Sequence, residues 1–110
     1  MSNNPSLEAN IALAKSAVFE MMKNWNLWKS AIHNEDKIQY IAAYAAAYTN
    51  CKVFIENYLK RLYPNERKMP TKVAQDVRNI VNDMDAIEKA NDQKLYKIIR
   101  DIDQLSRDAA

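Results

Sequence analysis

The fold is decided first by residues 7–32, which read LEANIALAKSAVFEMMKNWNLWKSAI. Their apolar side chains recur at alternating steps of four and three residues, which is the spacing of a helix that buries one face in a bundle. Ser6 stands immediately before this segment as a suitable N-cap, and Glu8 places a carboxylate in the first turn. A first helix is therefore predicted over about 7–32. Its stripe consists of Leu7, Ile11, Ala14, Val18, Met21, Trp25, Trp28 and Ile32.

The phase of this stripe predicts where the first helix ends. At about 100° per residue, a continuous helix would carry Ile38 and Ile41 to the side opposite the stripe. The chain is therefore expected to break near residues 33–36, where Asn34 suits an N-cap. A second helix is predicted over about 35–62, because Pro64 cannot continue it. It carries two apolar stripes, so we expect it to be buried on most sides.

The last third of the chain allows two interpretations. Pro64 and Pro70 bracket a loop, and the apolar positions from Val73 to Leu105 then stay within about 40° of one direction. This agreement favours one helix over about 71–107. A break near Asn91 is the alternative. The sequence thus predicts an all-α antiparallel bundle in a single domain over 1–110, with three long helices or, if the chain breaks near Asn91, with four.

Composition excludes several other classes of protein. Glycine is absent from all 110 residues, which argues against β-hairpins and phosphate-binding loops that need positive φ angles. A single cysteine, Cys51, excludes an internal disulfide. The first residues, MSNNPS, do not resemble a secretory signal, and the longest apolar stretch, 41–48, is too short to span a membrane. We therefore expect a cytoplasmic protein without membrane contact.

The sequence shows no spacing typical of a catalytic or metal site. His33 is the single histidine, whereas a metal site needs three or four ligands. Cys51 lies on an apolar stripe more than four helical turns from His33, too far for that base to activate it. Acidic residues that interleave the last apolar stripe are predicted to face solvent. They are Asp83, Asp85, Glu88, Asp101 and Asp103. We expect no enzymatic activity, no metal and no cofactor.

Two apolar surfaces are candidates for protein binding. A helix over 71–107 would be about 55 Å long, against about 39–42 Å for the other two, so its last turns would need a partner to cover them. The apolar residues there are Ile98, Ile99, Ile102 and Leu105. If the chain folds back near Asn91, the same residues complete the monomer core instead. The second surface is a ladder formed by Tyr40, Tyr44 and Tyr48. These surfaces favour a non-enzymatic interaction module (an adaptor, inhibitor or complex subunit) that self-associates.

A basic segment supports an alternative function. Residues 52–75 carry six bases against two acids, although the whole chain has a net charge of only +2. Within 60–72 the bases are Lys60, Arg61, Arg67, Lys68 and Lys72. Cations near a helix C-terminus stabilise the helix dipole, which accounts for Lys60 and Arg61 without a ligand. The alternative is a small helical subunit that binds nucleic acid through this segment.

Overall fold

The computed structural model describes residues 6–85 and 92–109, and these ranges hold four α-helices and no strand. The helices are α1 (Leu7–Ser30), α2 (Asn34–Leu62), α3 (Thr71–Asp85) and α4 (Asp92–Asp108), with a short 3₁₀ helix, η1 (Glu66–Lys68), between α2 and α3. The predicted all-α bundle is confirmed, in its four-helix form.

Local signals place the helix ends close to their predicted positions. The Ser6 hydroxyl caps α1 by accepting a hydrogen bond from the backbone N–H of Ala9 at 3.1 Å. One assignment was wrong by a residue: His33, not Asn34, is the N-cap of α2, and its side chain makes no capping hydrogen bond. After α2, Asn65 caps η1 by accepting from the N–H of Arg67 at 3.1 Å.

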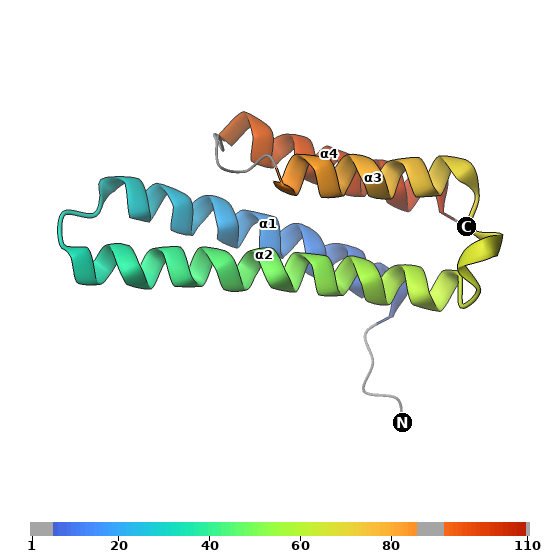
Figure 1. Cartoon of the computed structure of the whole chain (residues 1–110), viewed down its shortest axis with the longest axis horizontal. Coiled ribbons are helices and arrows are strands. Elements are labelled where there is room, and N and C mark those ends of the chain that lie inside the picture. Colours follow the sequence, from blue (N-terminus) through green and yellow to red (C-terminus); the bar gives the residue numbers. More distant parts are fainter. Residues whose placement is uncertain (1–5, 86–91, 110) are drawn as a thin grey trace, which may run out of the picture.

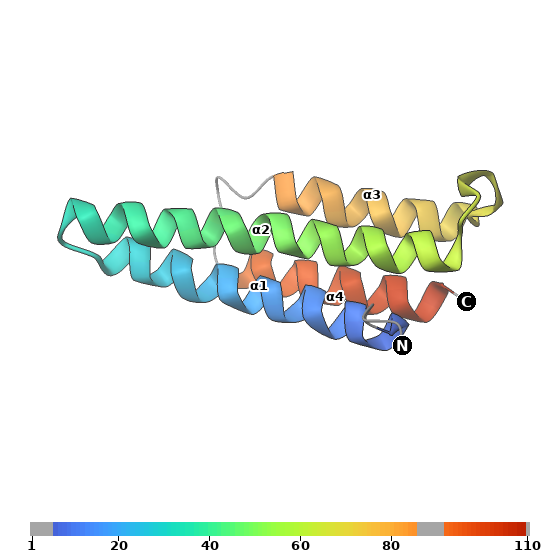
Figure 2. The ribbon, with the colours of Figure 1, turned by 90° about the horizontal axis from the view of Figure 1, so that it is seen from below.

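The helices form two antiparallel pairs stacked as two layers (Figures 1 and 2). α1 and α2 make the longer pair, joined by a tight turn at residues 31–33. The shorter α3–α4 pair lies on one face of the longer pair, so residues from the chain's last third lie above its first third.

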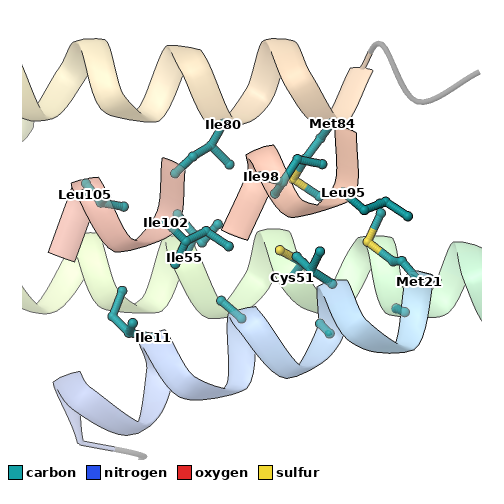
Figure 3. Close-up of a cluster of buried hydrophobic side chains, with 14 of the residues drawn as sticks. Ile11, Met21, Cys51, Ile55, Ile80, Met84, Leu95, Ile98, Ile102 and Leu105 are labelled. Carbon is teal, nitrogen blue, oxygen red and sulfur yellow. The ribbon is translucent and has the colours of Figure 1, made fainter. Parts of the chain in front are cut away.

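The core lies where the two layers meet. Figure 3 shows side chains from all four helices converging there, with Ile80 and Met84 of α3 above Ile55 and Cys51 of α2. Two polar side chains of α1, Asn10 and Asn24, are also buried. Four α4 residues have no exposed surface at all: Leu95, Ile98, Ile102 and Leu105.

The single helix favoured over 71–107 is wrong. α3 ends at Asp85 and α4 begins at Asp92, while Asn91 lies outside the described residues. Folding back is favourable because it buries the α4 stripe against α1 and α2, whereas a continuous helix would leave that stripe in water. The phase agreement misled the prediction because each of two separate helices has its own stripe, and the two stripes happen to align.

The predicted overhang is also reversed. From their residue counts, α1 and α2 are roughly 36 and 44 Å long, and α3 and α4 are roughly 22 and 26 Å long. The projecting element is therefore the turn end of the α1–α2 pair, which extends past α3 and α4 in both views (Figures 1 and 2).

Candidate protein-interaction site

The projecting end of the α1–α2 pair, residues 25–44, is here called the hairpin end. The hydroxyl of Tyr48 donates to a carboxylate oxygen of Asp85 at 2.9 Å, and Asp85 is the last residue of α3. This contact marks where α3 stops covering α2. Ile41 and Ile38 continue the same apolar row about two and three turns further on. The hairpin end thus begins where the upper layer finishes.

Apolar side chains on the hairpin end are unusually exposed. Ile32 in the turn is 87% exposed, and Ile38 and Ile41 on α2 are 68% and 39% exposed. Scattered apolar residues on a surface need no explanation, but here three exposed isoleucines lie at the same end of the α1–α2 pair. These side chains are on the surface because α3 and α4 are too short to reach them.

The hairpin end also contains an aromatic cluster. The Trp25 ring stacks on Trp28 with centroids 5.1 Å apart, and it contacts Tyr44 at 5.8 Å. Among the described residues, neither the buried Trp25 Nε1 nor the buried Tyr44 hydroxyl has a hydrogen-bond partner. A buried polar group without a partner costs about 1–3 kcal/mol. The rings of the aromatic cluster are therefore packed together, but Trp25 Nε1 and the Tyr44 hydroxyl lack a hydrogen-bond partner within the described part of the chain.

The tyrosine ladder does not form one open face. Tyr44 is buried, and burial raises its pKa well above the ordinary value. Tyr48 is half-buried and bonded to Asp85, and Tyr40 is half-buried. The ladder instead runs from the core out to the hairpin end.

The α4 residues that were predicted to bind a partner lie in the core of the monomer. Ile98, Ile102 and Leu105 are fully buried, and Ile99 is partly buried against the same core. The fold therefore removes the argument that these residues await a partner.

The five bases of the segment 60–72 gather at the opposite end of the molecule, around the end of α2, η1 and the start of α3 (Figure 1). Two of them are ion-paired: Lys60 with Glu56 at 2.6 Å and Lys72 with Asp108 at 3.1 Å. Arg67 and Lys68 lie on η1 and are exposed. Nearby carboxylates thus offset part of the positive charge that the sequence displays.

A groove separates α2 from α3 and was not predicted. Its volume is about 420 Å³. Its walls are mostly apolar, and charged residues line its α2 rim. The lining includes Ile55, Leu59, Met69, Val77, Ile80, Val81 and Met84.

No family model, curated protein or solved structure matches this chain.

The residues considered for catalysis stay apart. Cys51 has no exposed surface, and burial raises the pKa of its thiol to about 12. His33 is exposed in the turn beyond α1. Within residues 6–85 and 92–109 no three metal-binding side chains come together, and no helix there has the length and apolarity to cross a membrane.

Two of the acidic residues depart from the sequence prediction, whereas Asp85 is exposed as expected. Asp83 and Asp101 were expected to face solvent, but their side chains are only 23% and 17% exposed, and Asp76 is buried. They lie between α3 and α4, where the flanks of two neighbouring stripes meet. Glu88 lies outside the described residues. Reading each helix alone could not reveal that these flanks face one another.

Proposed function

We propose that this chain is a non-enzymatic protein–protein interaction module that self-associates through its hairpin end. The observation that carries the proposal is the exposure of Ile32 and Ile38 on a part of the α1–α2 pair that the upper layer does not cover. The proposal keeps the expected function and its expected cytoplasmic location. It drops the predicted surface on α4 and places binding at the hairpin end, which contains Tyr40 and Tyr44 of the predicted tyrosine ladder.

A second copy has the right shape to cover this surface. In each copy the long α1–α2 layer projects beyond the short α3–α4 layer (Figure 1). Two copies related by a two-fold axis fit together so that the hairpin end of one copy lies on the hairpin end of the other. The overlap is then again two layers of two helices, as in the body of the monomer. Such an isologous contact uses one surface twice and is the commonest symmetry of homo-oligomers.

The charges and the area of the surface favour a weak dimer. Residues 25–44 carry two acids, Glu35 and Asp36, and two lysines, Lys29 and Lys37, so two copies meet without net repulsion. An overlap about 15 Å long and two helices wide covers on the order of 300 Å² per copy. Stable interfaces bury about 800 Å² per partner, so dissociation is expected in the high micromolar range or above.

Sedimentation velocity over about 10 μM to 1 mM tests the proposal. The wild type should sediment faster as its concentration rises, whereas Ile38→Lys should remain a monomer throughout. The matched control is Phe19→Lys, because Phe19 is also an exposed apolar residue of the long pair, at 51%, but lies outside the hairpin end. A wild type that stays monomeric at 1 mM, or a control that dissociates as completely as Ile38→Lys, would contradict the proposal.

Nucleic-acid binding is the second candidate, supported by the five bases that gather at one end. Their partial neutralisation by Glu56 and Asp108 weakens it. Fluorescence anisotropy with labelled RNA and DNA at low salt separates the two candidates. Binding through phosphates should weaken steeply with salt, whereas apolar self-association should not.

A further inference from the structure

The α2–α3 groove has the build of a small-ligand site. Ile55, Ile80 and Met84 form its floor and are almost completely buried, and Figure 3 shows them between the two helices. Tyr63 and Met69, beside η1, line it where α2 leads into α3. The lining from Lys52 to Tyr63 covers about 16 Å of α2. A mostly apolar pocket of 300–1,000 Å³ with a few polar groups is typical of ligand sites.

The charged residues at the rim make the two ends of the groove different. Near η1, the ammonium of Lys60 pairs with the carboxylate of Glu56 at 2.6 Å. The negative charge of Glu66 also acts on Lys60 and helps to raise its pKa. At the other end, Lys52 lies 5.3 Å from the centroid of the Tyr48 ring. Within the described part of the chain, no carboxylate lies within ion-pair distance of Lys52. The ammonium of Lys52 is therefore free to meet an anion, whereas Lys60, the lysine that lines the η1 end, is already paired with Glu56.

We propose that the α2–α3 groove binds an anionic amphiphile with a single hydrocarbon tail, such as a long-chain carboxylate. The tail lies along Leu59, Val77 and Ile80, and the carboxylate meets the ammonium of Lys52. In the opposite orientation the anion would meet Lys60, whose charge Glu56 already offsets. One hydrocarbon chain fits the groove's volume of about 420 Å³.

Isothermal titration calorimetry with dodecanoate, kept below the concentration at which it forms micelles, tests this site on the full chain. The wild type should bind one equivalent saturably. Each CH₂ removed from the tail should weaken binding by about fourfold, because a methylene contributes a fixed amount when buried. Dodecyltrimethylammonium, with the same tail and a positive head, should bind at least tenfold more weakly.

Two variants locate the ligand. Val81→Trp fills the groove from its α3 rim, where Val81 is 40% exposed, and should weaken dodecanoate binding at least tenfold. The matched control is Val53→Trp, because Val53 is 43% exposed on α2 but does not line the groove, and it should bind as the wild type does. Lys52→Gln should weaken dodecanoate but leave dodecanol unchanged.

Circular dichroism confirms that each variant is folded before it is titrated. No saturable binding by the wild type overturns the proposal, as does equal binding of the anionic and cationic amphiphiles. Equal affinity of wild type and both groove variants, Val81→Trp and Lys52→Gln, does the same. Sedimentation of the unliganded wild type is independent of these results, so this site and the proposed self-association can fail separately.

Discussion

Asp101 on α4 and Asp83 on α3 lie beside Lys97 at the boundary between their helices, and each carboxyl group shifts the pKa of the other. Burial and the neighbouring Asp83 carboxylate raise the pKa of Asp101 to about 7, and the pKa of Asp83 is lowered, with hydrogen bonds from Asp101 and Lys97 favouring its charged form. Among the described residues, the buried Asp101 Oδ2 has no hydrogen-bond donor, although the Lys97 ammonium lies 3.8 Å away. A proton on Asp101, donated to Asp83, resolves that mismatch.

A second pair repeats this arrangement nearer the chain terminus. Burial and Asp108 raise the pKa of Asp76 to about 6, while Asp108 accepts from Gln104 at 2.9 Å and pairs with Lys72. The buried Asp76 Oδ2 also has no donor among the described residues. α3 and α4 thus bring two carboxyl groups together at two points, each with a lysine beside it, and we infer that one proton is shared at each point at low pH.

These pairs predict an unusual dependence of stability on pH. The raised pKa values of Asp76 and Asp101 contribute stability that is complete below about 3.8 and is lost as pH rises through about 6 and 7. The lowered pKa values of Asp83 and Asp108 act in the opposite sense, losing their stability only below about 3.8. We expect the melting temperature to peak near pH 4–5 and to fall towards pH 8.

Thermal melts followed by circular dichroism from pH 3 to 9 check this expectation. Across the interval between the two pKa values of Asp101, the slope is at most about 1.4 kcal/mol per pH unit for its one proton. A melting temperature that rises between pH 5 and 8, as for most proteins with ionised carboxylates in ion pairs, would contradict the shared protons.

Asp101→Asn should flatten this profile. An amide at this position donates to Asp83 as the protonated acid does, and it cannot ionise as pH rises. At pH 8 we expect a gain of about 1 kcal/mol, or about 4–8 °C in melting temperature.

The control is Asp103→Asn on the same helix. Asp103 pairs with Lys15 of α1 at 2.8 Å, and both side chains are about a third exposed. Its loss should lower stability by at most about 1 kcal/mol and leave the pH slope unchanged. Equal flattening by both variants would assign the slope to a general charge effect instead.

The fold could be predicted where a local signal and an apolar period agree. The stripe that begins at Leu7 and the cap at Ser6 placed α1, and Pro64 ended α2. The prediction was wrong at the α3–α4 boundary. There the turn signal, Asn91-Asp92, and the phase from Val73 to Leu105 disagreed, and the turn signal was correct. Phase describes one helix at a time, whereas burial of Ile98 and Ile102 depends on α1 and α2.

The surfaces were harder to predict than the helices. Ile32 and Ile38 belong to regular stripes in the sequence, but Ile32 lies in the turn after α1 and Ile38 lies on the part of α2 that projects beyond α3. The groove likewise depends on the spacing between α2 and α3, which no residue encodes by itself. The ion pair of Lys72 with Asp108 joins residues far apart in the chain, so the charge count overstated the basic patch. Interactions between helices account for each of these differences.

Ile98→Ala tests whether α4 belongs to the monomer core. Ile98 is fully buried, so the truncation should cost about 2–5 kcal/mol, whereas Ile99→Ala, at the half-buried neighbour, should cost much less. Urea denaturation followed by circular dichroism measures both. The loss should be the same at 5 and 100 μM protein, because the contact lies within one chain. A cost that depends on protein concentration would place Ile98 between chains.

Cys51 provides an independent probe of how firmly α4 closes the core. Its sulfur lies beneath α4 (Figure 3), has no exposed surface, and carries a pKa raised to about 12 by burial. Alkylation requires a thiolate that the reagent can reach, so the native protein must open first. With unfolding free energies of at least about 5 kcal/mol, iodoacetamide at pH 8 should react over 1,000-fold more slowly than in denaturant. The control is Cys51→Ala with Thr49→Cys, which moves the thiol to an exposed position on α2 and should react at the denatured rate. Rapid alkylation of native Cys51 would mean that α4 detaches readily and that the core is not closed as described.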